Sequence, residues 1–351
     1  MPKNRISQGA VKLEEVAQRA RVSASTVSCA LNNLYVVKDS TRLRVLKAVD
    51  ELGYHPDLHA RSLAGGSSRT IGVIVSNLEN PFFFDIYKTL EAGAHAGNYE
   101  VLIANTNYSS EQLVKSIRLM LGRRVSGLAI LVSEIMDPEL IESLSAGQIP
   151  IVFYDVGTAS RKITNIRVDY ARGVRTLVEY LYSVGHRRFG FLGHHAEFNP
   201  LNVRLRTVLE VAKTLSPEID VHSTAGEDDL EGGRQAVRDL LALDRDPTAI
   251  ICVNDIMAVG ALRELRERGY DVPGDISVTG FDDIALAEFC YPALTTVHIP
   301  RERIGQIICE CLIGKSSRVG SEIIIDPQLV LRKSTGMAPS KTSRFADRVR
   351  A

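Results

Sequence analysis

The chain has 351 residues, of which 45% are hydrophobic, and its 42 basic and 42 acidic side chains balance, as is typical of a globular protein with two or three domains. No apolar run approaches the roughly 18 residues of a membrane span, and the N-terminal segment MPKNRISQGAVK lacks an apolar signal core, so we expect a cytoplasmic protein without a membrane partner. We expect no metal and no cofactor, and we expect the scattered cysteines to be reduced core thiols: Cys29, Cys252, Cys290, Cys309 and Cys311.

The charge is unevenly distributed along the chain. Residues 1–70 hold 11 Lys and Arg against 6 Asp and Glu, so the remaining residues hold 31 against 36. A basic N-terminal part on an acidic body favours contact of that part with phosphates.

The first helical pattern covers residues 13–20, and its apolar positions share one face: Leu13, Val16, Ala17 and Ala20. Ser23 is a suitable N-cap for a second helix, whose predicted buried face consists of Val27, Ala30 and Leu31. Small side chains then face solvent or a groove: Ala24, Ser25, Ser28 and Cys29. Two short helices around a tight turn, with such side chains outward, are typical of a helix-turn-helix that reads DNA.

A third helix is predicted to begin near Ser40 and to end at Gly53. Its N-cap would be Asp39 or Ser40, and its inward side chains would be Leu43, Leu46, Val49 and Leu52. Residues 57–64 are compatible with a short helix, and the GGSS sequence at 65–68 with a flexible joint. We therefore divide the N-terminal part into a head at 1–56 and a hinge and linker at 57–69.

From Thr70 onward, short apolar runs alternate with helical stretches. The runs cover residues 71–75, 101–105, 127–132, 149–154, 189–193, 249–253 and 276–281. The helical stretches fall near residues 84–97, 110–122, 137–146, 171–184, 203–214, 231–243 and 256–268. This alternation predicts βαβ units with parallel sheets. Because the body is too long for one compact sheet, we predict two α/β lobes with a cleft between them, followed by a disordered tail at 338–351.

Six segments, in this order along the chain, resemble the lac repressor family of bacterial transcription regulators. They are VKLEEVAQRARVSASTVSCALN at 11–32, ELGYHPDLHARSLAGGSSRTIGV at 51–73, NPFF at 80–83, residues 166–193, ICVNDIMAVGAL at 251–262 and VTGFDDIALAEFCYPALTTV at 278–297. The resemblance implies a small all-α helix-turn-helix head joined to a two-lobed, periplasmic-binding-protein-like α/β sensor body with parallel sheets, in which residues 70–337 bind the effector and dimerise. The first lobe would comprise about residues 70–168 and 300–325, and the second about 169–299 and 326–337.

In the head, the resemblance places DNA contacts on and beside the second helix: Ser23, Ala24, Ser25, Thr26, Ser28, Cys29 and Asn32. Three positions depart from the family, because Lys12 replaces a Thr cap, Arg21 replaces a turn Gly, and Cys29 replaces an Arg that grips guanine. A Cys cannot make the bidentate contact of Arg with guanine, so we predict weaker readout of that base.

By the same resemblance, the hinge forms a short helix on operator DNA and inserts Leu63 into a base step of the minor groove. Ala60 would allow close approach, while His59 and Arg61 would meet phosphate. Asp57 stands where the family has Asn, and its expected role is to cap the hinge helix. A plain linker with Leu63 packed on the core remains the alternative.

The body lacks GxGxxG after its first strand and lacks GxxxxGK[ST], GxSxG and HExxH motifs, so we do not expect an enzyme. We expect a small-molecule site in the cleft, at the ends of the strands. The candidates, matched to the loops of the family, are Phe82, Phe83, Asp155, Asn202, Arg204, Arg206, Asn254 and Asp282. Arg206 matches the main ligand-gripping Arg, which with a facing carboxylate would hold vicinal hydroxyls of a sugar. Asp255 and Asp283 are expected to cap the helices that follow them.

Two further departures concern the effector. Asp228 stands where the family often has an aromatic side chain, and Leu209 replaces a Gly that follows the gripping Arg. Because His194 and His195 add polar groups nearby, a sugar acid or a sugar phosphate is a candidate effector as well as a plain sugar.

The sequence thus predicts a homodimeric repressor of carbohydrate-utilisation genes that binds a pseudo-palindromic operator in double-stranded DNA and responds to a sugar-like effector. Two alternatives stay open. One is a sugar-binding protein of the same fold that has lost specific DNA binding, which Cys29 and Asp57 suggest. The other is an α/β enzyme that carries a DNA-binding head.

Overall fold

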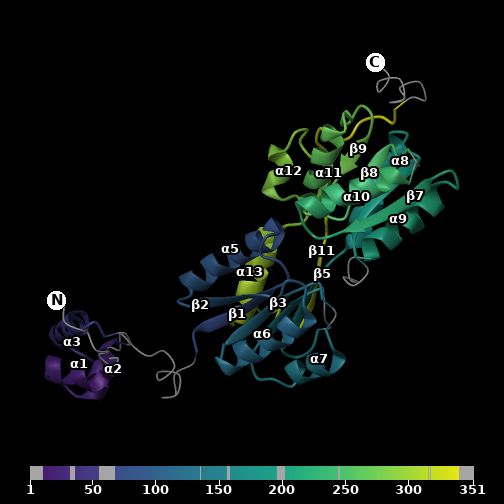
Figure 1. Cartoon of the computed structure of the whole chain (residues 1–351). Helices are drawn as coiled ribbons and strands as arrows, with labels where there is room; N and C mark the ends of the chain where they lie inside the picture. Colours follow the sequence, from purple (N-terminus) through teal and green to yellow (C-terminus); the bar gives the residue numbers. More distant parts are fainter. Residues whose placement is uncertain are drawn as a thin grey trace, which may run out of the picture. The chain divides into compact units, whose positions relative to one another are not determined.

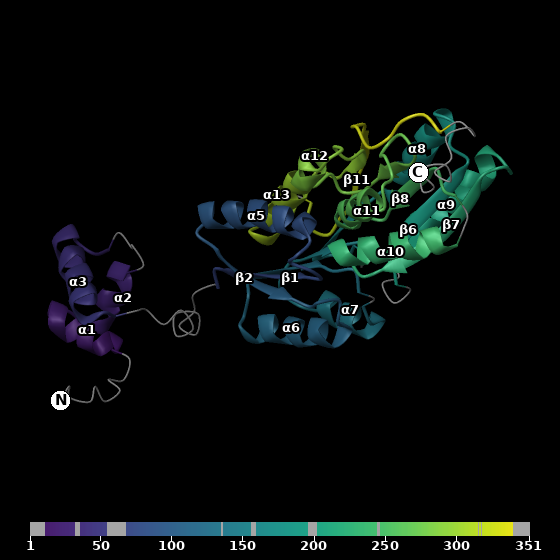
Figure 2. The ribbon, with the colours of Figure 1, turned by 45° about the horizontal axis from the view of Figure 1, so that its top comes forward.

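The chain divides into two compact units, Met1–Ser68 and Arg69–Ala351. The computed structural model describes residues 11–31, 36–54, 68–134, 136–155, 159–195, 202–243, 246–314, 316 and 318–339. Figure 1 and Figure 2 show a helical head and an α/β body. In the part of the chain that the structure describes, no helix is long and apolar enough to cross a membrane.

The head consists of α1 (Leu13–Ala20), α2 (Ala24–Leu31) and α3 (Asp39–Leu52). Its core contains Val16, Ala20, Val27 and Ala30, which confirms the faces predicted for the first two helices. Ser23 caps α2 as predicted, because the backbone N–H of Thr26 donates to its Oγ at 3.1 Å.

The start of α3 corrects one prediction. The helix begins at Asp39, and Lys38 is its N-cap with no side-chain capping bond, so neither Asp39 nor Ser40 is the N-cap. Its end agrees with the sequence, because Gly53 adopts a left-handed conformation with a φ of 61°.

The buried face of α3 corrects another prediction. Leu43 and Leu46, which we expected to face inward, are 68% and 45% exposed, whereas Val45 and Ala48 are buried. Both sets have helical spacing, so periodicity alone allows either face. The packing of α3 against α1 and α2 decides which one is covered.

The first lobe is built on a parallel sheet in the order β11-β5-β4-β3-β1-β2. Its strands are β1 (Thr70–Val75), β2 (Glu100–Asn105), β3 (Gly127–Leu131), β4 (Ile151–Tyr154), β5 (Ile163–Val168) and β11 (Glu322–Ile325). Its helices are α5 (Pro81–Ala96), α6 (Ser110–Gly122), α7 (Pro138–Ser145) and α13 (Arg301–Leu312).

Alternating side chains on β1 serve both faces of this sheet. Val73 and Val75 belong to the apolar cluster that includes α5 and α13, whereas Ile74 belongs to the cluster of α6 and α7. Figure 2 shows the corresponding layers, with α5 and α13 on one side of the strands and α6 and α7 on the other. Covering both faces leaves the carboxyl ends of the strands as the place for a site.

The second lobe is built on a smaller parallel sheet in the order β7-β6-β8-β9. Its strands are β6 (Arg188–His194), β7 (Asp220–Gly226), β8 (Ala249–Cys252) and β9 (Ser277–Thr279). Helix α8 (Tyr170–Ser183) packs with α9 (Asn202–Leu215), and α10 (Leu230–Ala242) packs with α11 (Asp255–Glu267). The short helix α12 (Ala285–Phe289) and the antiparallel pair β10 (Thr296–His298) and β12 (Gln328–Val330) complete the lobe.

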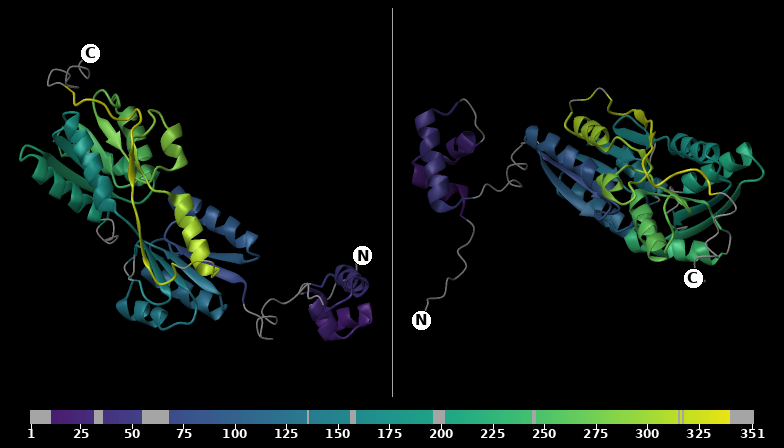
Figure 3. Two further views of the ribbon diagram at one scale, coloured as in Figure 1. Left: turned by 180° about the vertical axis from the view of Figure 1, so that it is seen from behind. Right: turned by 90° about the horizontal axis from the view of Figure 1, so that it is seen from above.

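The chain passes between the two sheets three times, from β5 to α8, from β10 to α13 and from β11 to β12. Figure 3 shows the C-terminal segment running along both lobes. The two lobes pack against each other, because one continuous apolar cluster includes side chains of both.

Each of the predicted runs in the body forms a strand, and each of the predicted helical stretches forms a helix. Sequence reasoning missed β5, β7, β10, β11, β12, α12 and α13. Strand β7 lies at a sheet edge and carries few apolar side chains, so its pattern resembles a loop. The tail predicted at 338–351 lies outside the described residues from position 340.

Candidate functional site

A pocket of about 390 Å³ lies where β3 and β4 of the first lobe end. Its volume falls in the usual range of small-molecule sites. Residues of both lobes line it. The polar ones include Ser133, Asp155, Asp169 and two tyrosines, Tyr154 and Tyr170, and the second lobe also contributes Val203.

Asp155 is the carboxylate of this pocket, and its orientation is fixed on both oxygens. The backbone N–H of Val168 donates to Oδ1 at 3.0 Å, and the hydroxyl of Tyr170 donates to Oδ2 at 2.8 Å. The hydroxyls of Tyr170 and Tyr154 lie 3.1 Å apart. Each Asp155 oxygen retains a lone pair for a further donor, so this group can accept hydrogen bonds from a ligand.

Arg204 is the buried cation next to the pocket. Its guanidinium packs against two neighbouring rings, with Cζ 4.4 Å from the centroid of Tyr170 and 4.3 Å from that of Phe281. Nη1 donates to the carbonyl of Val253, and Nη2 lies 3.8 Å from Oδ1 of Asp282. Arg204 is only 5% exposed, so this arrangement holds an Arg and a facing carboxylate in a site largely shielded from water.

The Arg that faces Asp282 is therefore Arg204, whereas Arg206, for which the family match predicts the gripping role, is exposed on α9. The helical period explains the difference, because Arg204 shares a face with Thr207, Val208 and Val211, all of which are buried. This apolar spacing was the sequence signal that could have identified Arg204.

Asp228 connects the two lobes, and sequence reasoning had noted it only as a departure. It precedes α10 in the second lobe, and its carboxylate accepts hydrogen bonds from Tyr108 and, at 3.5 Å, from Nδ2 of Asn80, both in the first lobe. Nδ2 of Asn77 donates to its backbone carbonyl at 3.3 Å. Within the second lobe, Nδ2 of Asn254 donates to its Oδ1 at 2.5 Å.

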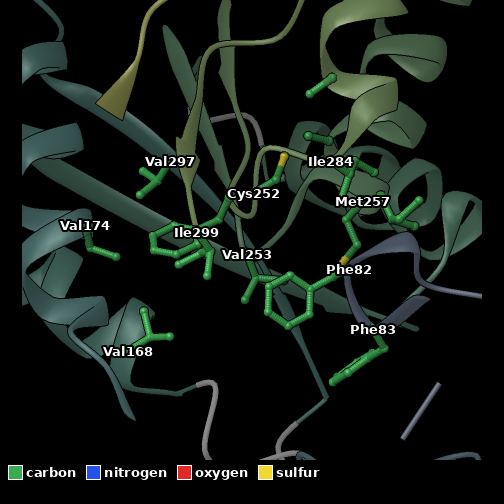
Figure 4. Packing of buried hydrophobic residues seen from close by; sticks show 14 of the residues in the cluster. Phe82, Phe83, Val168, Val174, Cys252, Val253, Met257, Ile284, Val297 and Ile299 are labelled. Atoms are coloured by element: carbon green, nitrogen blue, oxygen red, sulfur yellow. The ribbon is translucent and has the colours of Figure 1, made fainter. Parts of the chain in front are cut away.

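The predicted aromatic residues Phe82 and Phe83 are buried at the start of α5. Their ring centroids are 5.3 Å apart, and Phe82 lies 5.8 Å from the ring of Tyr154. Figure 4 shows both among buried side chains of the two lobes, including Val168 and Val253. Neither ring is among the residues that line the pocket, and Phe82 is next to it only through Tyr154.

The capping roles expected for two acidic residues are wrong. Asn254, and not Asp255, is the N-cap of α11, and it accepts from the N–H of Met257 at 3.0 Å. Asp255 instead accepts from the N–H of Ile284 at 2.8 Å and from the hydroxyl of Thr296 at 2.5 Å.

Asp283 does not cap α12 either, since Ile284 occupies that position. Its carboxylate lies 2.7 Å from Nη2 of Arg332 and 2.9 Å from Nδ1 of His298. Both acidic residues therefore tie the second lobe together through contacts that are distant in the sequence.

Burial changes the titration of the cleft carboxyls. It raises the pKa of Asp155 to about 6, although the bonds from Tyr170 and Val168 oppose the shift. It also raises the pKa of Asp282 to about 7, although Arg204 and Arg301 oppose it. The cleft therefore carries less negative charge below neutral pH than its acidic residues suggest.

These shifts predict how stability depends on pH. Both carboxyls titrate near pH 3.9 in the unfolded chain, so between about pH 4 and 6 the folded protein binds more protons than the unfolded one. The free energy of unfolding should therefore fall as pH rises through this window, by about 1.4 kcal/mol per pH unit for each group. Asp155→Asn should flatten this fall in urea unfolding at a series of pH values, whereas the exposed Glu210→Gln should not; equal slopes in both variants would contradict the assignment.

In the head, the candidate DNA contacts lie on one side of α2. Ser23 and Ser25 are exposed, whereas Ala24, Thr26, Ser28 and Cys29 are half-buried. Ser25, Thr26 and Cys29 share a shallow pocket of about 290 Å³ with the segment before α3. The predicted contacts Asn32, His59, Ala60, Arg61 and Leu63, and the side chain of Asn202 in the body, lie outside the described residues.

Arg21 shows what one departure in the turn does to the backbone. It occupies the left-handed C-cap of α1 with a φ of 55°, a conformation that suits Gly best. Its backbone N–H donates to the carbonyl of Gln18, at 3.2 Å, so the turn keeps its shape without glycine.

Comparison with known proteins agrees with both units. Residues 12–57 match the model of bacterial regulatory proteins of the lacI family, and residues 178–335 match the periplasmic binding protein-like domain. The HTH-type transcriptional repressor CytR of Escherichia coli (strain K12) is 33% identical over 335 residues, covering 94% of this chain and 98% of that protein.

Solved structures agree over the same length. The lac repressor dimer bound to operator and the anti-inducer ONPF has a TM-score of 0.78 at 29% identity, covering 93% of this chain and 99% of that one. The complex of the transcriptional regulator CelR with cellobiose has a TM-score of 0.65 at 26% identity, covering 92% and 99%. With such a relative along nearly its whole length, the chain belongs to the lacI family of bacterial regulatory proteins.

Proposed function

We propose that this chain is a dimeric transcriptional repressor of carbohydrate-utilisation genes, whose head binds a pseudo-palindromic operator and whose cleft binds a small sugar-like effector. The observation that carries the proposal is Arg204, packed against Tyr170 and Phe281 and facing Asp282 beside the pocket of Asp155. A fork of N–H donors beside carboxylates suits a molecule with neighbouring hydroxyls. The operator-bound lac repressor dimer and the CelR complex with cellobiose support the same function.

Effector binding in the cleft would change how the two lobes are arranged. Asp228 contacts groups of both lobes, so a molecule that changes these contacts changes the balance between their arrangements. Through the hinge, that balance would alter operator affinity by the usual coupling of about 1–3 kcal/mol, which corresponds to about 5- to 150-fold. Such a repressor works where the DNA is, which places it in the cytoplasm.

Apolar side chains on the second lobe support a dimer. Phe289 and Tyr291, at and beyond the end of α12, are 82% and 83% exposed, and Leu286 of the same helix is also exposed. A patch of this kind is typical of a protein interface. A two-fold pair of chains would present two heads to two equivalent half-sites.

The test combines DNA selection with effector binding on the full chain. We expect selection from random duplexes to recover a pseudo-palindromic site, and fluorescence anisotropy to show a 5- to 150-fold change in its affinity when a saccharide binds. Saccharide binding without any preference over random DNA would favour instead a sugar-binding protein of the same fold. Turnover of the saccharide would favour an enzyme.

The half-buried Cys29 makes a separate prediction about the operator. In Cys29→Arg, the guanidinium can reach two acceptors of one guanine, so discrimination at one base position of each half-site should rise by about 1–3 kcal/mol. Sequencing of duplexes selected by each protein would measure this change. Cys29→Ala is the control and should select the same sites as the natural chain; an unchanged site for Cys29→Arg would place position 29 outside base contact.

A further inference from the structure

We propose that the cleft selects an uncharged or positively charged effector rich in O–H and N–H donors, such as a neutral sugar or an amino sugar, and rejects sugar acids and sugar phosphates. This inference rests on the proposed function, because it names the chemistry of the same site. It follows from the balance of charges around Arg204 and from the hydrogen bonds that these charged groups already make.

Above neutral pH, where Asp155 and Asp282 are mostly ionised, the charges around the cleft are mainly negative. Asp155 follows β4, Asp228 precedes α10, and Asp282 lies between β9 and α12, and Asp228 and Asp282 are both buried. Among the described residues, Arg204 is the only Lys or Arg that is buried. Two buried carboxylates, Asp228 and Asp282, therefore stand against one buried guanidinium, and like charges disfavour an anionic ligand there.

Two groups of the protein already engage the guanidinium of Arg204. Nη1 donates to Val253 and Nη2 faces Asp282, while the rings of Tyr170 and Phe281 pack against the guanidinium. Nε is buried and makes no hydrogen bond within the described structure. An anion would have to share the guanidinium with the carboxylate of Asp282, whereas a hydroxyl oxygen needs only one of the N–H groups that remain.

Asp228 carries a negative charge without a cationic partner in hydrogen-bond contact. Its carboxylate receives neutral donors from Tyr108, Asn80 and Asn254. Nε2 of His194 lies 3.9 Å away, and burial lowers the pKa of this imidazole, which favours its neutral form. A cationic ligand would supply the positively charged partner that Asp228 lacks, whereas an anionic ligand would be repelled by Asp228.

The pocket is lined by a carboxylate that can accept from a ligand and by a cation that is already paired. Arg167 lines the pocket, but this side chain is paired with Glu322 at 2.9 Å. Asp155 faces the pocket with an open lone pair on each oxygen. A carboxylate can accept a hydrogen bond there from a hydroxyl or an ammonium group of the ligand.

Isothermal titration calorimetry of the full chain tests this with matched forms of the same sugars. For glucose, ribose, galactose and cellobiose, we compare the parent sugar with its amino, aldonic acid and phosphate forms. We expect a parent sugar or its amino form to bind at least about 10-fold more tightly than its acid and phosphate. Tightest binding by an acid or phosphate would overturn this inference and leave the proposed regulator intact, whereas binding by no member of the panel would contradict the sugar effector itself.

Two variants separate charge from shape. Asp228→Asn removes one negative charge at nearly constant volume, and should narrow the gap between aldonic acid and parent sugar by about 10-fold, within the range for a charged hydrogen-bonding partner. Glu210→Gln makes the same change in charge on the exposed face of α9 and should leave the gap unchanged. Asp155→Asn provides a second cleft variant if Asp228→Asn does not fold. An unchanged gap in a folded cleft variant would overturn the inference.

Discussion

Replacing Arg204 with Ala should weaken effector binding by about 100-fold or more and remove the influence of the effector on operator affinity. The substitution removes a donor fork that is already oriented by Tyr170 and Phe281, and it leaves Asp282 buried without its cationic partner. A lost hydrogen bond to a charged group costs about 1.5–3 kcal/mol, and an unpaired buried charge adds to that cost.

Arg206→Ala is the matched control, because it removes the same side chain two residues away on the exposed face of α9. We expect it to change effector affinity by less than about twofold, as is usual for exposed charges. Arg204→Lys keeps the charge but loses the planar fork, so its affinity should lie between those of the natural chain and Arg204→Ala. Calorimetry on variants with unchanged circular dichroism measures all three; loss of binding in Arg206→Ala alone would return the gripping role to Arg206.

Replacing Gly260 with Ala should lower the free energy of unfolding by about 3 kcal/mol or more. Helices α10 and α11 approach so closely that an added Cβ at Gly260 would collide with the backbone carbonyl of Leu230. A Cβ at Gly233 would collide in the same way with the carbonyl of Met257. Backbone atoms cannot rotate away as a flexible side chain can, so the two helices would have to separate.

Gly122→Ala is the control for this prediction. Gly122 is also a helical glycine, in α6, but an added Cβ there would meet no atom within 4 Å. Because Ala loses less conformational entropy than Gly in a helix, this variant should be stabilised by about 0.5–1 kcal/mol. Urea unfolding compares the two. If the free energy of unfolding of Gly260→Ala lay within 1 kcal/mol of that of the natural chain, the two helices would separate at little cost in stability.

The separation of α10 from α11 would also reach the cleft. Asp228 lies just before α10 and Asn254 just before α11, and their side chains are joined by a hydrogen bond of 2.5 Å. The close packing of two glycines therefore supports the position of a carboxylate that contacts the first lobe.

Sequence reasoning went furthest where a local pattern is sufficient. The apolar runs of the body identified strands such as β1 and β3, because a strand covered on both faces needs a continuous apolar segment. The pairing of α1 with α2 followed from the spacing of apolar residues and from the cap at Ser23. The polar edge strand β7 lacked such a pattern and was missed.

It went less far where two patterns fit equally well. Leu43 and Leu46 have the same helical spacing as Val45 and Ala48, and only packing against the other head helices decides which pair is covered. The same ambiguity applied to Arg204 and Arg206, which differ by two positions and therefore lie on opposite sides of α9.

The sequence by itself determined the order of helices and strands, the division into head and body, and the membership of the chain in its family. The tertiary structure alone decided that Arg204 faces Asp282 and that Asp228 joins groups from residues 80, 108 and 254. The physical reason is that periodicity reports which face of an element is apolar, whereas the contacts of a buried charge depend on crossings that bring distant strand ends together.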